Sequence, residues 1–320
     1  MARLIFKDHP SANWRTGHDF PQVTLTAVSW ESEPGTAVAY VFFGHVNIDF
    51  DGSPTAYGPP GITPMPDDDL ANAWGEDNGW FGLIALPENH PLVTSGEAII
   101  DKRASLLHKG KYPVIQQAKN GDPKPGYYVS ATPHATGPAH LQTSYVDASE
   151  IAYGALSGQL ASLGFKLGDY GLAIRHNKNL QSGFYFVDRG GAASFALGEC
   201  SHKVGKNLGG SGRGNAFNNN FPVSFIVFPD SFTMDGSEGT PSMSDADIKI
   251  ELDLLLTDLG KADNAEELAL LMGFNEMAPP GKPRGKARLD TYRSAPTTTA
   301  KPANYATIVA ALSNYGYVIP

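Results

Sequence analysis

The pattern of apolar and polar positions divides the chain into two parts with different periodicities. In the first 235 residues, apolar residues alternate with polar ones or form short runs, which is typical of β-strands. Glycine and proline separate these runs and favour turns between them. From about residue 236 onward, apolar residues recur every three or four positions, which predicts helices. We therefore expect a β domain over residues 1–235 and a smaller helical region over residues 236–320.

The predicted strands are short segments rich in β-branched and aromatic residues, the residue types that suit a pleated sheet. They cover residues 22–30, 36–50, 79–86, 111–117, 126–133, 170–176, 182–188 and 221–229, with a further strand or turn at 147–156. Many short strands joined by glycine-rich turns favour a closed or sandwich-like arrangement. The predicted fold is mainly β, with a closed β-barrel over residues 1–235.

Helices are predicted mostly at the C-terminal end, where caps and stop signals flank the periodic segments. They cover residues 244–260, 264–274 and 305–316, with a short additional helix at 67–75. Residues 278–288 and 293–304 are predicted to be linkers because they combine proline with small and polar residues.

Composition limits the classes of function. The formal net charge is −9 with a pI near 5.4, which argues against nucleic acid or anionic lipid as a partner and is compatible with a cationic substrate. A single cysteine, Cys200, cannot form an internal disulfide. The N-terminal segment lacks the apolar core of a signal peptide, and no apolar run is long enough to cross a membrane. We expect a soluble protein, cytoplasmic as synthesised, whose export would need a route without such a signal.

Two acids suggest chemistry on a glycan. Asp188 ends a predicted strand, and Glu199 follows eleven positions later, after a run of small residues. Glycoside hydrolysis needs one carboxylic acid to protonate the leaving oxygen and one carboxylate to activate water. The apolar neighbours of Glu199 should raise its pKa, as a general acid requires, while Arg189 should keep Asp188 ionised as the base. The reverse assignment stays open, as does a structural role in which Asp188 begins a turn and Glu199 is an exposed strand residue.

Other residues are candidates for contacts with a sugar chain. Tyr57, Trp74 and Tyr127 could stack on sugar rings, whereas Trp80 fits better in the core. Asp147 could line a cleft or cap a turn.

Binding of a metal or cofactor is not predicted. Asp49 and Asp51 begin like a calcium loop, but Pro60 stands where such a loop needs a glutamate, so the segment is a turn. His134 and His140 have no acid at metal-ligand spacing, and the glycine-rich segment around Gly210 lacks the lysine of a phosphate loop.

A set of segments follows one another in a recognisable order. They are "NIDFDGSPTAYGP", "LANAW", "GWFGLIAL", "GDPKPGYYVSAT", "YVDASEIAYGAL" and "LGDYGLAIRH". Together, over about residues 42–231, they resemble glycoside hydrolase family 75, the chitosanases of fungi and their bacterial relatives. The resemblance implies endo-hydrolysis of a β-1,4-linked glucosamine polymer with inversion at the anomeric carbon. It assigns the family's catalytic acids to Asp188 and Glu199, with Cys200 in place of the usual glycine, and lets Asp49 and Asp51 hold ammonium groups beside the cleft.

A shorter resemblance suggests an alternative substrate. The two acids with small residues between them are also similar to the double-psi β-barrel of lytic transglycosylase A-type enzymes, which cleave peptidoglycan strands. On this reading the protein is an antibacterial effector, and residues 236–320 bind a carrier or an immunity protein. A third reading is a glycan-binding module without activity.

Overall fold

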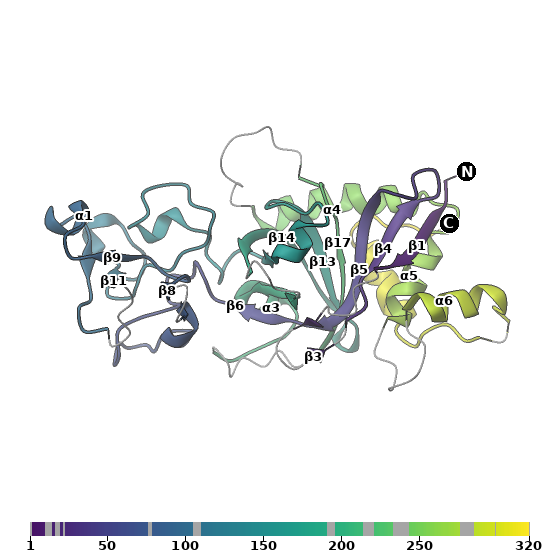
Figure 1. Cartoon of the computed structure of the whole chain (residues 1–320). Coiled ribbons are helices and arrows are strands. Elements are labelled where there is room, and N and C mark those ends of the chain that lie inside the picture. Colours follow the sequence, from purple (N-terminus) through teal and green to yellow (C-terminus); the bar gives the residue numbers. More distant parts are fainter. Residues whose placement is uncertain are drawn as a thin grey trace.

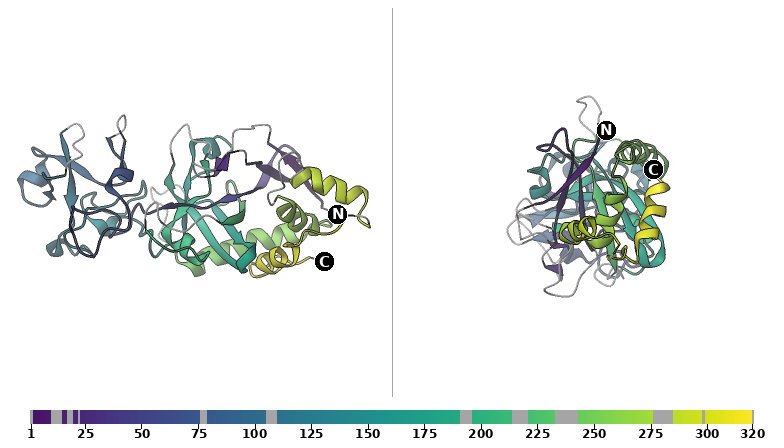
Figure 2. Two further views of the ribbon diagram at one scale, coloured as in Figure 1. Left: turned by 90° about the horizontal axis from the view of Figure 1, so that it is seen from below. Right: turned by 90° about the vertical axis from the view of Figure 1, so that its right-hand side faces the viewer.

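An elongated molecule is formed by a large sheet with helices on it and a smaller lobe that extends from one end (Figure 1). This computed structural model describes residues 2–9, 15–16, 20–21, 23–75, 79–104, 110–190, 196–213, 221–232, 243–275, 285–297 and 299–319. Both chain ends lie at the end of the molecule opposite the lobe (Figures 1 and 2).

The large sheet has nine strands and remains open. Their order is β1 (Leu4–Asp8), β4 (Thr26–Trp30), β5 (Ala37–His45), β17 (Pro222–Val227), β13 (Tyr170–Arg175), β14 (Leu180–Arg189), β12 (Tyr153–Leu156), β16 (Glu199–Ser201) and β6 (Asn47–Asp49). Two pairs are parallel, β12 with β14 and β16 with β6, and the others are antiparallel.

The predicted mainly β fold with a closed, double-psi-like barrel is wrong. The fold is mixed α/β, and β1 and β6 are the two edges of the sheet, with no described strand pairing one to the other. A barrel needs its first and last strands to pair at a fixed stagger. Short strands and glycine-rich turns occur in open and closed sheets alike, so the pattern could not decide between them.

Helices of the C-terminal part cover the sheet. They are α4 (Asp245–Gly260), α5 (Glu266–Phe274), α6 (Gly285–Ser294) and α7 (Tyr305–Ser313). The predicted helices at 244–260, 264–274 and 305–316 are confirmed, and Ser244 forms the capping box of α4 with Asp247. Helix α6 was not predicted and overlaps the ends of both predicted linkers, 278–288 and 293–304; Leu289, which lies between them, buries its side chain and anchors the helix.

Sheet and helices share one hydrophobic core. Phe42 and Phe225 stack inside it with ring centroids 4.6 Å apart, and Leu252 of α4 belongs to the same cluster. Gly183 on β14 lets α4 approach closely, because a Cβ at that position would lie 2.7 Å from Leu252 Cδ1. Helix α4 thus packs directly on β13 and β14, α5 packs on β5 and β17, α6 contacts β1, and α7 packs on α5.

The smaller lobe, residues 50–145, connects β6 to β12. It contains β7 (Trp74–Gly75), β8 (Gly79–Trp80), β9 (Ala85–Pro87), β10 (Ile99–Ile100), β11 (Lys111–Ile115) and α1 (Pro91–Thr94), with the 3₁₀ turns η1 (Leu70–Ala73), η2 (Ala118–Asn120) and η3 (Gln142–Ser144). The helix predicted at 67–75 is only the turn η1, and the strand predicted at 126–133 forms isolated bridges.

Buried polar side chains hold this lobe together. Gln142 donates to the carbonyls of Gly52 and Ser130, and Asp122 accepts from the backbone N–H groups of Gln142 and Gln117. These bonds satisfy backbone groups that lie in no sheet ladder. Two small hydrophobic clusters accompany them, one around Tyr128 and one around Val114.

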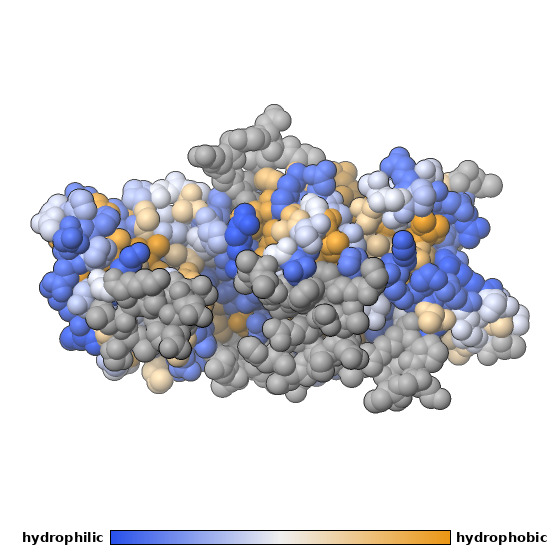
Figure 3. Space-filling model, viewed as in Figure 1, coloured by the Kyte–Doolittle hydropathy of each residue, from blue (hydrophilic) through white to orange (hydrophobic). Residues whose placement is uncertain are grey.

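Remaining elements are short. They are α2 (Gly158–Ala161), α3 (His202–Asn207), η4 (His176–Lys178) and a small sheet of β15 (Ala196–Leu197), β2 (Arg15–Thr16) and β3 (Phe20–Pro21). In the space-filling view, hydrophobic residues reach the surface in several separate patches between hydrophilic ones (Figure 3). Among the described residues, no helix has both the length and the apolar character needed to cross a bilayer.

Candidate active site

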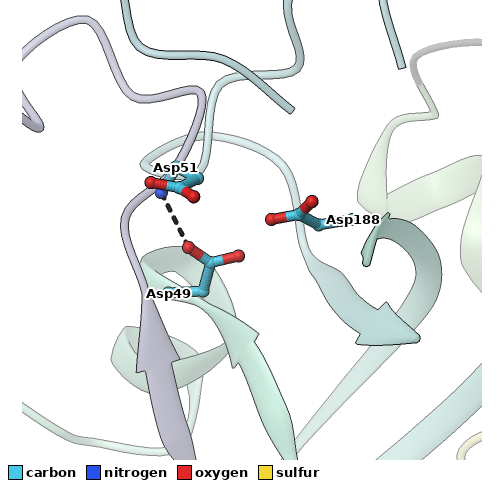
Figure 4. A group of neighbouring side chains, drawn as sticks. All are labelled: Asp49, Asp51 and Asp188. Atoms are coloured by element: carbon cyan, nitrogen blue, oxygen red, sulfur yellow. Dashed lines mark hydrogen bonds between the residues drawn. The ribbon is translucent and has the colours of Figure 1, made fainter. Parts of the chain in front are cut away.

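Four carboxyl groups meet where the lobe joins the sheet. Asp49 ends β6, Asp51 follows in the first turn of the lobe, Asp188 lies near the end of β14, and Glu199 begins β16. Side-chain oxygens of the three aspartates lie within 4.8 Å of one another (Figure 4). The charge of Asp49 also acts on Glu199, and the charge of Glu199 acts on Asp51. We call Asp49, Asp51, Asp188 and Glu199 the acid cluster; it contains both predicted catalytic acids.

A bulge in β14 sets the direction of Asp188. Tyr153 of β12 lies opposite Tyr185, but Ala155 lies opposite Asp188, so β14 carries one extra residue, Val187. Residues two apart on a strand share a face, and so do paired residues on neighbouring strands. Asp188 is therefore on the face of Tyr153. If β14 were regular there, with Val187 opposite Ala155, Asp188 would share the face of the buried Phe186.

Hydrogen bonds fix the geometry of the acids. The backbone N–H of Asp51 donates to Asp49 Oδ1 at 2.8 Å (Figure 4). The Tyr57 hydroxyl donates to Asp51 Oδ1 at 2.7 Å. The Tyr153 hydroxyl lies 2.5 Å from the Asp51 carbonyl and 3.2 Å from Asp49 Oδ2. The turn predicted at Asp49 and Asp51 is thus also part of the site.

Burial disfavours the charged form of every acid in the cluster. It raises the pKa of Glu199 to about 7, with the charge of Asp49 as the second cause. The direction predicted for Glu199 from its apolar neighbours is confirmed. Glu199, Asp49 and Asp51 nevertheless keep part of their surface exposed.

The expectation that Arg189 keeps Asp188 ionised is wrong. Asp188 is only 7% exposed, and burial, followed by the charges of Asp49 and Asp51, raises its pKa well above the usual value. The backbone N–H of Arg189 donates to Asp188 Oδ1 at 2.6 Å and lowers the pKa, but burial and the two acids outweigh this bond. The Arg189 side chain itself is exposed to solvent.

Two glycines leave room for the acids. A Cβ on Gly82 would lie 2.4 Å from Asp51 Oδ1, too close for any real contact. A Cβ on Gly190 would lie 3.1 Å from Glu199 Oε2. Gly82 belongs to the lobe and Gly190 follows β14, so each part of the molecule leaves space beside one carboxyl group.

The other predicted site residues have different surroundings. Tyr127 is buried and its hydroxyl donates to the Pro64 carbonyl, so its ring forms part of the lobe interior. Tyr57 is also buried and contacts Asp51. Asp147 lies outside the acid cluster, where its Oδ1 accepts hydrogen bonds from the backbone and hydroxyl of Ser149. The side chain of Trp74 lies outside the described residues.

Sequence reasoning missed Tyr153, Gly82 and Gly190. The only signal for Tyr153 was its position on a buried strand, because a buried tyrosine hydroxyl needs a hydrogen-bond partner. For the two glycines the sequence carried no signal, since the crowding comes from residues distant in the chain.

The spacing of the three aspartates suits a hard cation or a shared proton. The neighbouring Asp49 raises the pKa of Asp188, whereas the contact with Asp188 lowers the pKa of Asp49, so Asp188 is the member of this pair that binds a proton more readily. That the protein works without a metal or cofactor stays a prediction.

Cys200 is buried, and burial raises the pKa of its thiol, which suits an inert side chain.

Comparison with known proteins adds no assignment: no protein-family model matches the chain, and no curated protein matches it. The acid cluster and the resemblance of the ordered segments are therefore the basis for a functional proposal.

Proposed function

We propose that the protein is an endo-acting, inverting glycosidase that cleaves β-1,4 bonds of a glucosamine polymer, as the chitosanases of family 75 do. The observation that supports this proposal is the convergence of Asp188 and Glu199, from two different strands, into one acid cluster. Two carboxyl groups with different proton affinities are what glycoside hydrolysis requires.

Glu199 is the proposed general acid. With a pKa of about 7 it is largely protonated in weakly acidic solution and can give its proton to the glycosidic oxygen as that bond breaks. The residue is partly exposed, which a polymer substrate at the surface would require.

Asp188 is the proposed base. In its ionised form it takes a proton from water while the water oxygen bonds to the anomeric carbon. The glycosidic bond breaks on the opposite side, and Glu199 supplies the proton to the leaving sugar. One water is consumed, and Glu199 ends ionised while Asp188 ends protonated. Proton exchange with solvent restores the starting state.

The cluster also suits the proposed substrate. Asp51 has a pKa well above the usual range because of burial first and the charge of Asp49 second. A bound ammonium group would stabilise the ionised form of such acids, so an amino sugar gains more from this site than a neutral one. The net charge of −9 attracts the same polymer over longer distances.

The test is incubation with chitosan and, separately, with purified peptidoglycan sacculi, followed by mass spectrometry of the products and NMR of the first anomer. The proposal expects soluble oligomers from chitosan with inverted configuration. Fragments from sacculi alone, or anhydro ends, would favour the peptidoglycan-cleaving alternative. Retention on a chitosan column without new reducing ends, unchanged in Asp188→Asn and Glu199→Gln, would favour the inactive binding module.

A further inference from the structure

Tyr153 occupies the place where the sheet meets the lobe. It lies on β12, the strand between β14, which carries Asp188, and β16, which carries Glu199. Its side chain is fully buried, and its hydroxyl lies 2.5 Å from the Asp51 carbonyl and 3.2 Å from Asp49 Oδ2. From the interior of the sheet, one hydroxyl thus reaches both the end of β6 and the first turn of the lobe.

The backbone of Tyr153 is held by both neighbouring strands. It pairs with Tyr185 of β14, and its N–H donates to Ser201 Oγ of β16 at 3.1 Å. The Ser201 hydroxyl donates in turn to the Ile151 carbonyl at 2.8 Å. Because β14 and β16 also carry the two proposed catalytic acids, the Tyr153 hydroxyl is a fixed reference point relative to them.

Asp51 has three of its four polar groups engaged in hydrogen bonds. Its backbone N–H donates to Asp49 Oδ1, its carbonyl accepts from Tyr153, and its Oδ1 accepts from Tyr57. Within the described part of the chain, no residue donates a hydrogen bond to Asp51 Oδ2, and the residue keeps part of its surface exposed. Oδ2 is therefore the atom of Asp51 that is left for a ligand.

An ammonium group is the ligand that suits this carboxylate oxygen. It is a cation with three N–H donors, whereas the acetamide of an N-acetylated sugar is neutral and has one. A carboxylate that is already held in one orientation loses less entropy on binding than a mobile one. The position of Asp51 should therefore decide how strongly the site prefers free amino groups.

The bond from Tyr153 is the one that ties Asp51 to the interior of the sheet. The other two partners are local in the chain, since Asp49 is two positions away and Tyr57 six, and Tyr57 belongs to the lobe itself. Tyr153 is 102 positions away. A carbonyl can only accept, so the tyrosine supplies the proton, and Tyr153→Phe would leave the Asp51 carbonyl without this donor.

We propose that Tyr153 is a positioning residue that holds Asp51 beside the proposed catalytic pair and thereby makes the site prefer sugars with free amino groups over N-acetylated sugars. The preference rests on the proposed function. The hold on Asp51 is a property of the protein without substrate and can be observed independently.

The first test needs no substrate. Amide hydrogen exchange is followed by NMR in wild type and Tyr153→Phe. The proposal expects about tenfold faster exchange at Asp51 and Gly52 in the variant, because the peptide group between them loses its hydrogen-bond donor. The amide of Gln142, which donates to Asp122 inside the lobe, should keep its rate. Unchanged exchange at Asp51 and Gly52, or an equal increase at Gln142, would overturn the proposal.

Tyr317→Phe is the matched control variant. Tyr317 is equally buried, and its hydroxyl also donates to a backbone carbonyl, that of Ala265, among the C-terminal helices. Both variants should lower the melting temperature, but Tyr317→Phe should leave exchange at Asp51 and the kinetics unchanged. Equal effects of the two variants on Asp51 or on the kinetics would reduce Tyr153 to a structural residue and contradict the positioning role.

The second test compares glucosamine oligomers with partly N-acetylated ones. Tyr153→Phe should raise KM for glucosamine oligomers about tenfold and change kcat less than about threefold, because Asp188 and Glu199 keep their strands. KM for the N-acetylated oligomers should change less. A fall in kcat at unchanged KM would mean that Tyr153 acts on the catalytic acids instead of on Asp51.

A double-mutant cycle shows whether Tyr153 acts through Asp51. Asp51→Asn should abolish the preference for free amino groups, and Tyr153→Phe added to it should have no further effect on that preference. An effect of Tyr153→Phe that persists in full in the Asp51→Asn background would refute the inference.

Failure of this inference can be told apart from failure of the proposed function. If wild type cleaves neither chitosan nor sacculi but Tyr153→Phe speeds exchange at Asp51, the glycosidase assignment fails and the hold of Tyr153 on Asp51 stands. If wild type cleaves chitosan and exchange at Asp51 is unchanged in the variant, the glycosidase assignment stands and the positioning role fails.

Discussion

The sheet with its helices and the smaller lobe are stabilised in different ways. The sheet and helices α4 to α7 share one extended hydrophobic core, while the lobe has two small apolar clusters and a network of buried polar side chains. Each part contributes to the acid cluster: Asp49, Asp188 and Glu199 come from strands of the sheet, and Asp51, which accepts from Tyr57, comes from the lobe. The comparison suggests that the sheet fixes the reacting acids and that the lobe sets their surroundings.

Removal of an acid on the sheet side should have the largest effect. Glu199→Gln should lower kcat on the proposed substrate by about 10³-fold, because the leaving sugar loses its proton donor. In wild type, activity should fall as the pH rises through about 7, where Glu199 loses its proton. Steady-state rates with chitosan oligomers, from pH 4 to 9, measure both effects.

The same variant should be more stable than wild type in neutral solution. The folded-state pKa of Glu199 is raised from 4.5 to about 7, so its favourable contribution is fully present below about pH 4.5 and is lost as the pH rises through 7. At pH 8, Glu199→Gln should therefore raise the melting temperature. A lower melting temperature there would mean that the lost activity reflects unfolding.

Core truncation should separate the two parts by stability. Leu252→Ala, in the shared core, should cost about 3 kcal/mol of unfolding free energy because the buried leucine leaves a cavity. Val114→Ala, in the lobe, removes fewer buried atoms and should cost about 1 kcal/mol. Urea unfolding followed by circular dichroism gives both values, and equal losses would argue against the proposed difference.

Acid should weaken the attachment of the helices to the sheet. The buried His176 ring links the sheet to the helices. It accepts a hydrogen bond from the side chain of Asn304, the residue before α7, at 2.7 Å, and it contacts the Ser224 hydroxyl of β17, also at 2.7 Å. The Ser224 hydroxyl in turn donates to the Met272 carbonyl of α5 at 3.4 Å. Burial lowers the pKa of His176 from 6.5 to about 4, so only the unfolded chain binds a proton there between those values. Stability is present above pH 6.5 and falls as the pH drops toward 4, by about 3 kcal/mol.

A matched variant isolates this contribution from the protonation of carboxyl groups. His176→Gln cannot take up the proton, so its unfolding free energy should depend less on pH between 7 and 4 than that of wild type. Parallel curves for the two proteins would contradict the role given to His176.

The smallest of these effects is expected from the lobe side of the acid cluster. Gly82→Ala places a methyl group against Asp51 Oδ1, and the end of that side chain can move away. We expect about a tenfold loss of kcat/KM with little change in stability, since the lobe interior is otherwise intact. Gly61→Ala is an unsuitable control because of its positive φ, whereas Gly35→Ala meets open space. Equal activity of Gly82→Ala and Gly35→Ala would show that the position of Asp51 does not matter.

Local pattern predicted the parts of the fold that depend on neighbouring residues. The strands at 170–176, 182–188 and 221–229 are confirmed, as are three of the C-terminal helices. In each of them, apolar residues recur with the period that places them on the buried side of that element. Pairing of strand ends, which decides between a barrel and an open sheet, depends on residues far apart in the chain and was predicted wrongly. In the lobe, hydrogen bonds from Gln142 and Asp122 take the place of ladders, so strand patterns were misleading there.

The candidate site was predictable in its acids but not in their environment. Asp49, Asp51, Asp188 and Glu199 were identifiable from turn position, apolar neighbours and resemblance. The contact of Tyr153 with Asp49 joins residues 104 positions apart, and the reversal of the expected pKa of Asp188 follows from burial and two acids on other elements. Such effects need the tertiary arrangement.

The extra residue in β14 separates the position of Asp188 along the chain from the side to which it points. Loss of Val187 would remove the bulge but keep Phe186 opposite Gly154 and Asp188 opposite Ala155, so the carboxyl group would stay on its present side. Regular pairing of the unchanged sequence, with Val187 opposite Ala155, would instead turn Asp188 toward the phenylalanines of the interior. A homologue with a one-residue gap at Val187 would therefore keep its acid in place and should not be sorted among the inactive copies.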